Sequence, residues 1–296
     1  MTRRGWFLFT ALCVIWGVPY LLIKVAVRDI SPAALVFLRT TLGTLVLLPL
    51  SLRPGQYRPL LARWRPFLLY TAVEIALPWF LLSDAERHLS SSLTGLLIAA
   101  VPLVGAMLSA ASGGHERFDG RRIAGLLLGL VGVAALLGLD VGGGDVVAVA
   151  KMAVVVLCYA AGPLIISRRL ADVPSMPVVT ASLALCAIGY APFAIAQLPA
   201  ALPSVEVIAA VVILGIVCTA LAFLVFFRLI AEVGPVRATV VTYVNPAVAV
   251  SLGVTLLHES FTAGTAVGFV LILTGSFLAT RAAPAPRSAP SVAPAD

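Results

Sequence analysis

Two ionisable side chains, Glu74 and Arg39, lie inside long apolar stretches of this chain. Glu74 is in the middle of the stretch 64–83, and Arg39 lies about seven residues into the stretch 32–52. A charge at bilayer depth costs at least about 2.5 kcal/mol on insertion scales, so such residues are candidates for function. Glu74 could take up a proton or bind an ammonium group, and Arg39 could bind a carboxylate or modulate Glu74. A structural ion pair between neighbouring helices is the alternative.

Aromatic and polar residues in other apolar stretches could complete a binding site. Tyr and Trp offer a large contact area with one polar atom, and Asn and Thr supply donors and acceptors. With Arg39 and Glu74 they form our set of substrate-binding candidates, namely Trp16, Tyr20, Trp79, Tyr159, Thr219, Tyr243 and Asn245. The alternatives stay open, since Trp16 could face lipid and Tyr243 could pack in the core. Such a set suits an organic substrate with a flat or apolar part.

The elements that carry these residues are apolar segments long enough to cross a membrane. The chain has 296 residues, of which 61% are hydrophobic and 11% are charged, which is too apolar for a soluble domain of this length. Helices of roughly 20 residues span the hydrocarbon layer. We predict an all-α polytopic membrane protein with ten transmembrane helices, near 6–27, 32–52, 64–83, 89–111, 121–139, 146–167, 176–198, 206–228, 235–257 and 262–280.

The sequence is also an internal repeat. Residues 13–139 align with 157–280 at an offset of 143 to 144. Copies with an odd number of spans enter the bilayer from opposite sides, which predicts two inverted five-helix repeats. We place the repeats at 1–140 and 141–281, followed by a disordered cytoplasmic tail at 282–296. The counterparts of Glu74 and Arg39 lie near Cys218 and Ser182 and are uncharged.

Prolines occupy matched positions in the two repeats. Pro19 aligns with Pro163, and Pro102 aligns with Pro246. A proline inside a membrane helix removes one backbone hydrogen bond and loosens the preceding turn. Single prolines of this kind are mostly structural, but two matched pairs near the middle of the membrane favour a role as hinges.

The charge distribution predicts the orientation of the chain. Of the twenty Lys and Arg residues, fifteen fall on the side of the termini, including Arg3, Arg4 and Arg121. This is the positive-inside pattern, so we expect a multi-pass protein of the cell (inner) membrane with both termini in the cytoplasm. The net charge of +7 then reflects topology and not a nucleic-acid partner. A cleaved signal peptide at the first span is disfavoured by the matching span at 146–167.

The four cysteines all lie in predicted helices, without a disulfide framework or a CxxC pattern. We therefore expect neither a metal site nor a cofactor. Glu116 and Glu259 precede the fifth and tenth helices, where an acid near a helix N-terminus favours a structural role over substrate contact. A hydroxyl in the serine run 90–92 could cap the fourth helix.

The closing segments of both halves resemble the EamA repeat of the drug/metabolite transporter superfamily. They read HERFDGRRIAGLLLGLVGVAALLG at 115–138 and HESFTAGTAVGFVLILTGSFLAT at 258–280. Further similar stretches are WGVPYLLIKVA at 16–26, LRTTLGTLVLLP at 38–49 and VVTYVNPAVAV at 240–250. The resemblance implies a ten-helix basket, with the first four helices of each half around a central cavity and the fifth and tenth outside. It also implies alternating access by rocking and bending of the halves.

We therefore expect a secondary transporter that exports a small metabolite, such as an amino acid or an amphipathic organic compound. Export follows only from the tendencies of the family. A passive channel or a membrane scaffold is the main alternative. An intramembrane lipid-modifying enzyme is the least favoured, because the helices carry no HExxH motif and no Ser/His/Asp arrangement, and we expect no enzyme.

Small residues four positions apart permit close helix contact in the last helix of each half. Gly125 and Gly129, and Gly264 and Gly268, form these patterns. Intramolecular packing is the simpler expectation, and a homodimer through either face is the alternative.

Overall fold

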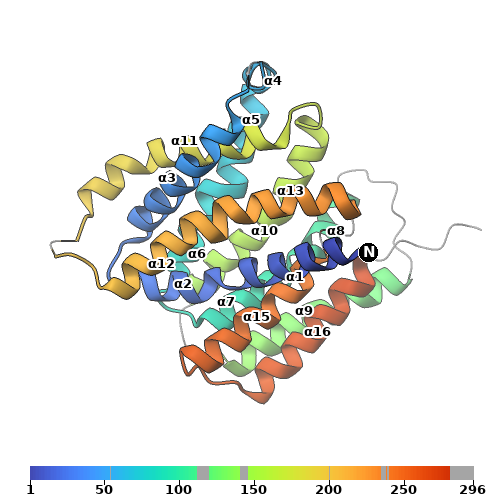
Figure 1. Cartoon of the computed structure of the whole chain (residues 1–296). Helices are drawn as coiled ribbons and strands as arrows, with labels where there is room; N and C mark the ends of the chain where they lie inside the picture. Colours follow the sequence, from blue (N-terminus) through green and yellow to red (C-terminus); the bar gives the residue numbers. More distant parts are fainter. Residues whose placement is uncertain are drawn as a thin grey trace, which may run out of the picture.

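The computed structural model describes residues 1–53, 55–111, 120–140, 146–199, 201–234, 238 and 240–280. Every regular element in these ranges is a helix (Figure 1). Glu116 and the tail predicted at 282–296 lie outside the described residues.

The first half begins with α1 (Arg3–Gly17), α2 (Pro19–Ala26) and α3 (Pro32–Ser51). It continues with α4 (Arg58–Ala62), α5 (Trp64–Tyr70), the π-helix η1 (Thr71–Ala76), α6 (Leu77–Ala85), α7 (Ser91–Ile98), α8 (Val101–Ala111) and α9 (Gly120–Asp140). The second half consists of α10 (Val146–Arg169), α11 (Ser175–Ala196), α12 (Val205–Gly215), the π-helix η2 (Ile216–Leu221), α13 (Ala222–Val233), α15 (Val241–Leu256) and α16 (Ala263–Thr280).

These helices form membrane-length apolar segments. By length and composition, seven segments of the described chain can cross a membrane, and shorter apolar helices cover Ile123–Ala135, Val241–Leu256 and Ala263–Leu278. Together they fall on the predicted spans, which confirms the all-α polytopic membrane fold.

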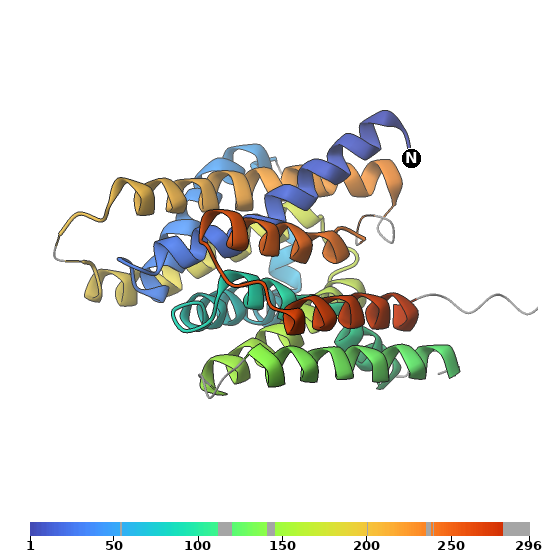
Figure 2. The ribbon, with the colours of Figure 1, turned by 90° about the horizontal axis from the view of Figure 1, so that it is seen from below.

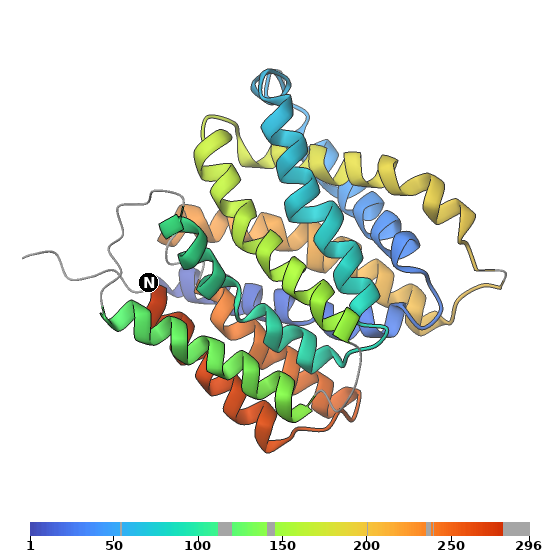
Figure 3. The ribbon, with the colours of Figure 1, turned by 180° about the vertical axis from the view of Figure 1, so that it is seen from behind.

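Helices of the two halves pack in the pairs that a pseudo-two-fold axis would generate. Equivalent helices pack on each other in three pairs, α3 with α11, α7 with α15, and α9 with α16. The two-fold relation also matches α1 with α10 and α13 with α6, and accordingly α1 packs on α13 while α10 packs on α6. Figure 3 shows α6 and α10 side by side from behind. Residues from both halves therefore meet in the middle of the bundle.

The proline pairs do not have equal structural effects. The helix is interrupted at Val18 before Pro19, and again between Ile98 and Val101, next to Pro102. Pro163 and Pro246 instead lie inside the unbroken helices α10 and α15. The hinge role of these four prolines stays a prediction.

Both third helices contain a π-helical turn at matching places of the repeat. Glu74 lies in η1, and Cys218, which aligns with it, lies in η2. In η1 the wider turn precedes Pro78, which has no N–H to donate, and Leu77 N–H donates to Ala72 O. A π-turn rotates the following residues around the helix axis, so it changes which side chains face the interior.

Helices α9 and α16 lie side by side at one edge of the bundle (Figure 2). Their contact is close because glycines meet there. A Cβ added to Gly275 would lie 2.6 Å from the Gly125 carbonyl oxygen and 2.6 Å from the Gly129 Cα. Glycines of the first pattern thus serve packing within the chain, whereas a homodimer through either glycine face stays a prediction.

We expect Gly275→Ala to lower the melting temperature of the purified protein. The added methyl group overlaps backbone atoms that cannot rotate away, and overpacking of this kind costs about 1–3 kcal/mol. Gly105→Ala in α8 is the matched control, because its Cβ would meet nothing within 4 Å. Equal melting temperatures of both variants, measured by differential scanning fluorimetry, would contradict the close contact of α9 and α16.

Candidate functional site

Arg39 is held at the junction of α3, α6 and η2. Its Nε donates a 2.9 Å hydrogen bond to Thr219 Oγ1, and its Cζ lies 3.7 Å from the centre of the Trp79 ring. Thr219 Oγ1 in turn donates to the Leu214 carbonyl oxygen at 2.8 Å. A guanidinium over an indole face gains about 2 kcal/mol when it is desolvated. These contacts offset part of the cost of placing the cation inside the bundle.

Two tyrosines lie beside this cation. Tyr20 on α2 and Tyr159 on α10 are near enough to interact electrostatically with the Arg39 guanidinium. Tyr20 and Trp79 are 8% and 7% exposed. These two rings are buried, whereas Arg39 itself is only partly buried.

Glu74 occupies the same region from η1, facing α10. Its Oε2 is buried and makes no hydrogen bond to any residue that the structure describes. A Cβ added to Gly162 would overlap this carboxylate. Glycine at position 162 therefore provides the space that Glu74 fills, next to Pro163.

The alternative of an ion pair between Arg39 and Glu74 does not describe this arrangement. Within the described ranges no salt bridge joins the two, and Arg39 binds Thr219 and Trp79 instead. Tyr159 is near both residues, since it interacts electrostatically with each of them.

Three other candidates lie at helix interfaces. The Trp16 ring packs on Phe226 of α13, with ring centres 4.9 Å apart. With its amide nitrogen turned toward two carbonyl groups, Asn245 donates to Val241 O and to Cys13 O of α1. Tyr243 OH donates to Ser276 O of α16 at 3.4 Å. A substrate-binding role for these residues stays a prediction.

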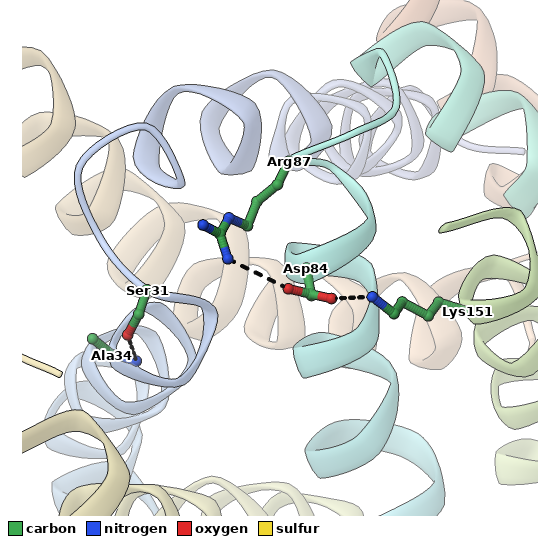
Figure 4. Close-up of polar contacts among 5 residues, drawn as sticks. All are labelled: Ser31, Ala34, Asp84, Arg87 and Lys151. Atoms are coloured by element: carbon green, nitrogen blue, oxygen red, sulfur yellow. Dashed lines mark hydrogen bonds and ion pairs between the residues drawn. The ribbon is translucent and has the colours of Figure 1, made fainter. Parts of the chain in front are cut away.

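A second polar cluster, which sequence reasoning did not include among the site residues, lies at the end of α6. Lys24 Nζ donates to the carbonyl oxygens of Glu86 and Leu89 at 2.6 and 2.7 Å. The Glu86 side chain is completely buried. Asp84, two residues before Glu86, pairs with Lys151 and lies 3.7 Å from Arg87 (Figure 4). Lys24 near the end of an apolar span was the only sequence signal for this cluster.

Glu259 joins this end of the bundle to the second half. Its carboxylate accepts hydrogen bonds from the backbone N–H groups of Ser91 and Ser92 at 2.7 and 2.9 Å, and from both hydroxyl groups. It therefore caps the N-terminus of α7 rather than the helix that follows it. Ser90 Oγ accepts from Leu93 N–H at 3.1 Å, which confirms the predicted serine cap.

Two grooves lie apart from these residues. One of about 570 Å³ is lined mainly by apolar side chains of η1 and α11, together with Thr71 and Tyr190. Another of about 340 Å³ lies between α2, α12 and the end of α15. No substrate-binding candidate lines either groove, so the two grooves do not help to define the site.

Comparison with known proteins gives one family and one fold. The EamA-like transporter family matches residues 3–138 and 147–281. A Bacillus subtilis (strain 168) protein named "Uncharacterized transporter YvbV" is 24% identical over 285 residues, which cover 95% of this chain and 93% of that protein. A solved crystal structure with 24% identity superposes with a TM-score of 0.65, covering 95% of this chain and 97% of that one.

We expect Gly162→Ala and Glu74→Ala to be strongly coupled in stability. Gly162→Ala alone should lower the melting temperature, because its methyl group displaces the Glu74 carboxylate. Removing that carboxylate makes room, so the double variant should recover part of the loss, with a coupling energy of about 0.5–3 kcal/mol. Gly189→Ala, where a Cβ would meet nothing within 4 Å, is the control partner. Additive effects of Gly162→Ala and Glu74→Ala would contradict the contact.

Proposed function

Because this chain belongs to the EamA-like transporter family, we propose that it is a secondary transporter that exports a small metabolite by alternating access. Its substrate is an amino acid or another amphipathic organic compound that carries a carboxylate. The repeats 1–140 and 141–281 are the two moving halves. They lie in the cell (inner) membrane with both termini in the cytoplasm.

The observation that supports this proposal most is that the two terminal guanidinium nitrogens of Arg39 donate no hydrogen bond to the described residues. Among the residues that the structure describes, Nε is the one guanidinium nitrogen of Arg39 that donates a hydrogen bond. Both terminal nitrogens remain able to form the paired bonds that a carboxylate accepts from arginine. Trp79 and Thr219 fix the orientation of the guanidinium, which lowers the entropic cost of binding.

The side chains around Arg39 suit the rest of such a substrate. The rings of Tyr20, Trp79 and Tyr159 provide flat apolar surfaces with polar edges. Glu74, which also interacts electrostatically with Tyr159, can accept a proton or the ammonium group of an amino acid. If ammonium and proton compete for this carboxylate, export of the substrate is coupled to entry of a proton.

Movement between the two access states has supporting features in both halves. The helix breaks at Pro19 and Pro102 and the π-turns η1 and η2 are positions where helical hydrogen bonding is already irregular. Bending at these positions disrupts fewer regular bonds than bending elsewhere. Pro163 and Pro246 have no N–H to donate, so each helix has one regular hydrogen bond fewer next to the proline.

We expect the protein, reconstituted in proteoliposomes, to catalyse saturable counterflow of at least one compound in a panel of amino acids and amphipathic carboxylates. Glu74→Gln should abolish transport driven by a pH gradient while retaining exchange, because glutamine keeps the shape but cannot carry a proton. Glu206→Gln, at an exposed carboxylate, is the matched control. Absence of counterflow across the panel would contradict a carrier, and flux that does not saturate would indicate a channel.

A further inference from the structure

The carboxylate of Glu86 is buried without a hydrogen-bond partner. The residue follows the last turn of α6, outside the membrane-spanning segment Trp64–Ala85, and its relative exposure is 0%. Both Oε1 and Oε2 are inaccessible and make no hydrogen bond within the described part of the chain. An ionised carboxylate in this situation would lose its hydration without replacement, which is unfavourable by several kcal/mol.

The neighbouring cation does not remove this penalty. The Lys24 ammonium group donates hydrogen bonds to the backbone carbonyl oxygens of Glu86 and Leu89, just after α6, and not to the Glu86 carboxylate. Lys24 favours the ionised form of Glu86 through its charge and its backbone N–H, and Arg39 also favours it, whereas the Glu259 carboxylate disfavours it. Burial outweighs these charges, and it raises the pKa of Glu86 well above its ordinary value.

Glu86 is also connected electrostatically to the central site. Tyr20 interacts with both Glu86 and Arg39, and Tyr159 interacts with Tyr20, Arg39 and Glu74. Both buried carboxylates therefore interact with tyrosines that also interact with Arg39, the proposed substrate ligand. A change of charge at either carboxylate alters the potential at Arg39.

The surroundings of Glu86 include a contact between the two halves. Glu86 lies where α2, the end of α6 and the start of α7 meet, and the last of these is held by Glu259 from the second half. Separation of the halves at this end would break the Glu259 bonds to Ser91 and Ser92 and admit water to Glu86. Hydration favours the ionised form, so opening lowers the proton affinity of this carboxylate.

We propose that Glu86 is a second proton-carrying carboxylate of this transporter, which holds a proton while Glu259 of the second half is bonded to α7 and gives it to water when these bonds break. The proton leaves an oxygen of the carboxyl group and returns to the same group when the bonds re-form, and no other covalent bond changes. The proposal rests on the proposed transport function, because a proton site of this kind matters only if the halves move.

The test is the pH dependence of thermal unfolding of the purified full-length protein. A group with a raised pKa in the folded state contributes stability that is complete below its unfolded pKa, about 4.3, and is lost as the pH rises through the folded pKa. We expect the melting temperature of the wild type to fall by several degrees between about pH 5 and pH 8. Glu86→Gln should flatten this slope, since glutamine resembles the neutral acid, whereas the exposed Glu206→Gln control should keep it.

An unchanged pH slope in Glu86→Gln would overturn the proposal. If Glu86→Gln does not fold, Glu86→Asp takes its place, because aspartate retains a titratable carboxyl group. The measurement is then an infrared spectrum. The wild type near pH 7 should then show the carbonyl band of a protonated carboxylic acid that shifts in Glu86→Asp. A spectrum unaffected by Glu86→Asp would also overturn the proposal.

Neither the melting curves nor the infrared spectra need a substrate. Failure to find a transported compound would therefore contradict the proposed function without deciding whether Glu86 is protonated, which the two measurements test separately. Once a substrate is found, Glu86→Gln should change the pH profile of counterflow. A uniform loss at every pH would indicate a structural role and contradict the proposal.

Discussion

The arrangement around Arg39 depends on one constraint, the high free energy of a permanently charged guanidinium inside an apolar bundle. The chain meets it with an indole face, a hydroxyl acceptor and two nearby phenols, supplied by helices of both halves. The π-turn η2 contributes directly, because Thr219 lies in it and donates back to Leu214. The terminal nitrogens of Arg39 have no such partner among the described residues, which is why we propose that a ligand carboxylate binds there.

The helix packing of the two repeats is symmetric, but their ionisable residues are not. Helices pair as two-fold related halves require, and both third helices contain a π-turn at the same place. In the first half this turn carries Glu74, while the aligned residue of the second half is Cys218. Gly162 of the second half then accommodates Glu74. One half thus contributes Arg39 and Glu74, and the other contributes the space for Glu74 and the hydroxyl acceptor for Arg39.

Much of this could be predicted from the sequence, because length, hydropathy and repeat alignment specify spans without knowledge of side-chain directions. Glu74 and Arg39 stand out by residue type alone. Trp16, Tyr243 and Asn245 were chosen by depth, but adjacent helical positions point about 100° apart, so depth does not tell which face a residue occupies. The π-turns shift that direction again without a clear sequence signal. Glu86 was missed because an acid next to a turn is normally hydrated, and only the fold reveals that α2 and α7 bury it.

The central claim is that Arg39 binds the carboxylate of the transported compound, and thermal stabilisation by a metabolite library tests it most directly. A ligand that binds only the folded state at 100 times its Kd adds about 2.7 kcal/mol of stability. We predict that carboxylated amphipathic compounds raise the melting temperature of the wild type and leave that of Arg39→Gln unchanged. Equal stabilisation of wild type and Arg39→Gln by the same compounds would contradict the account.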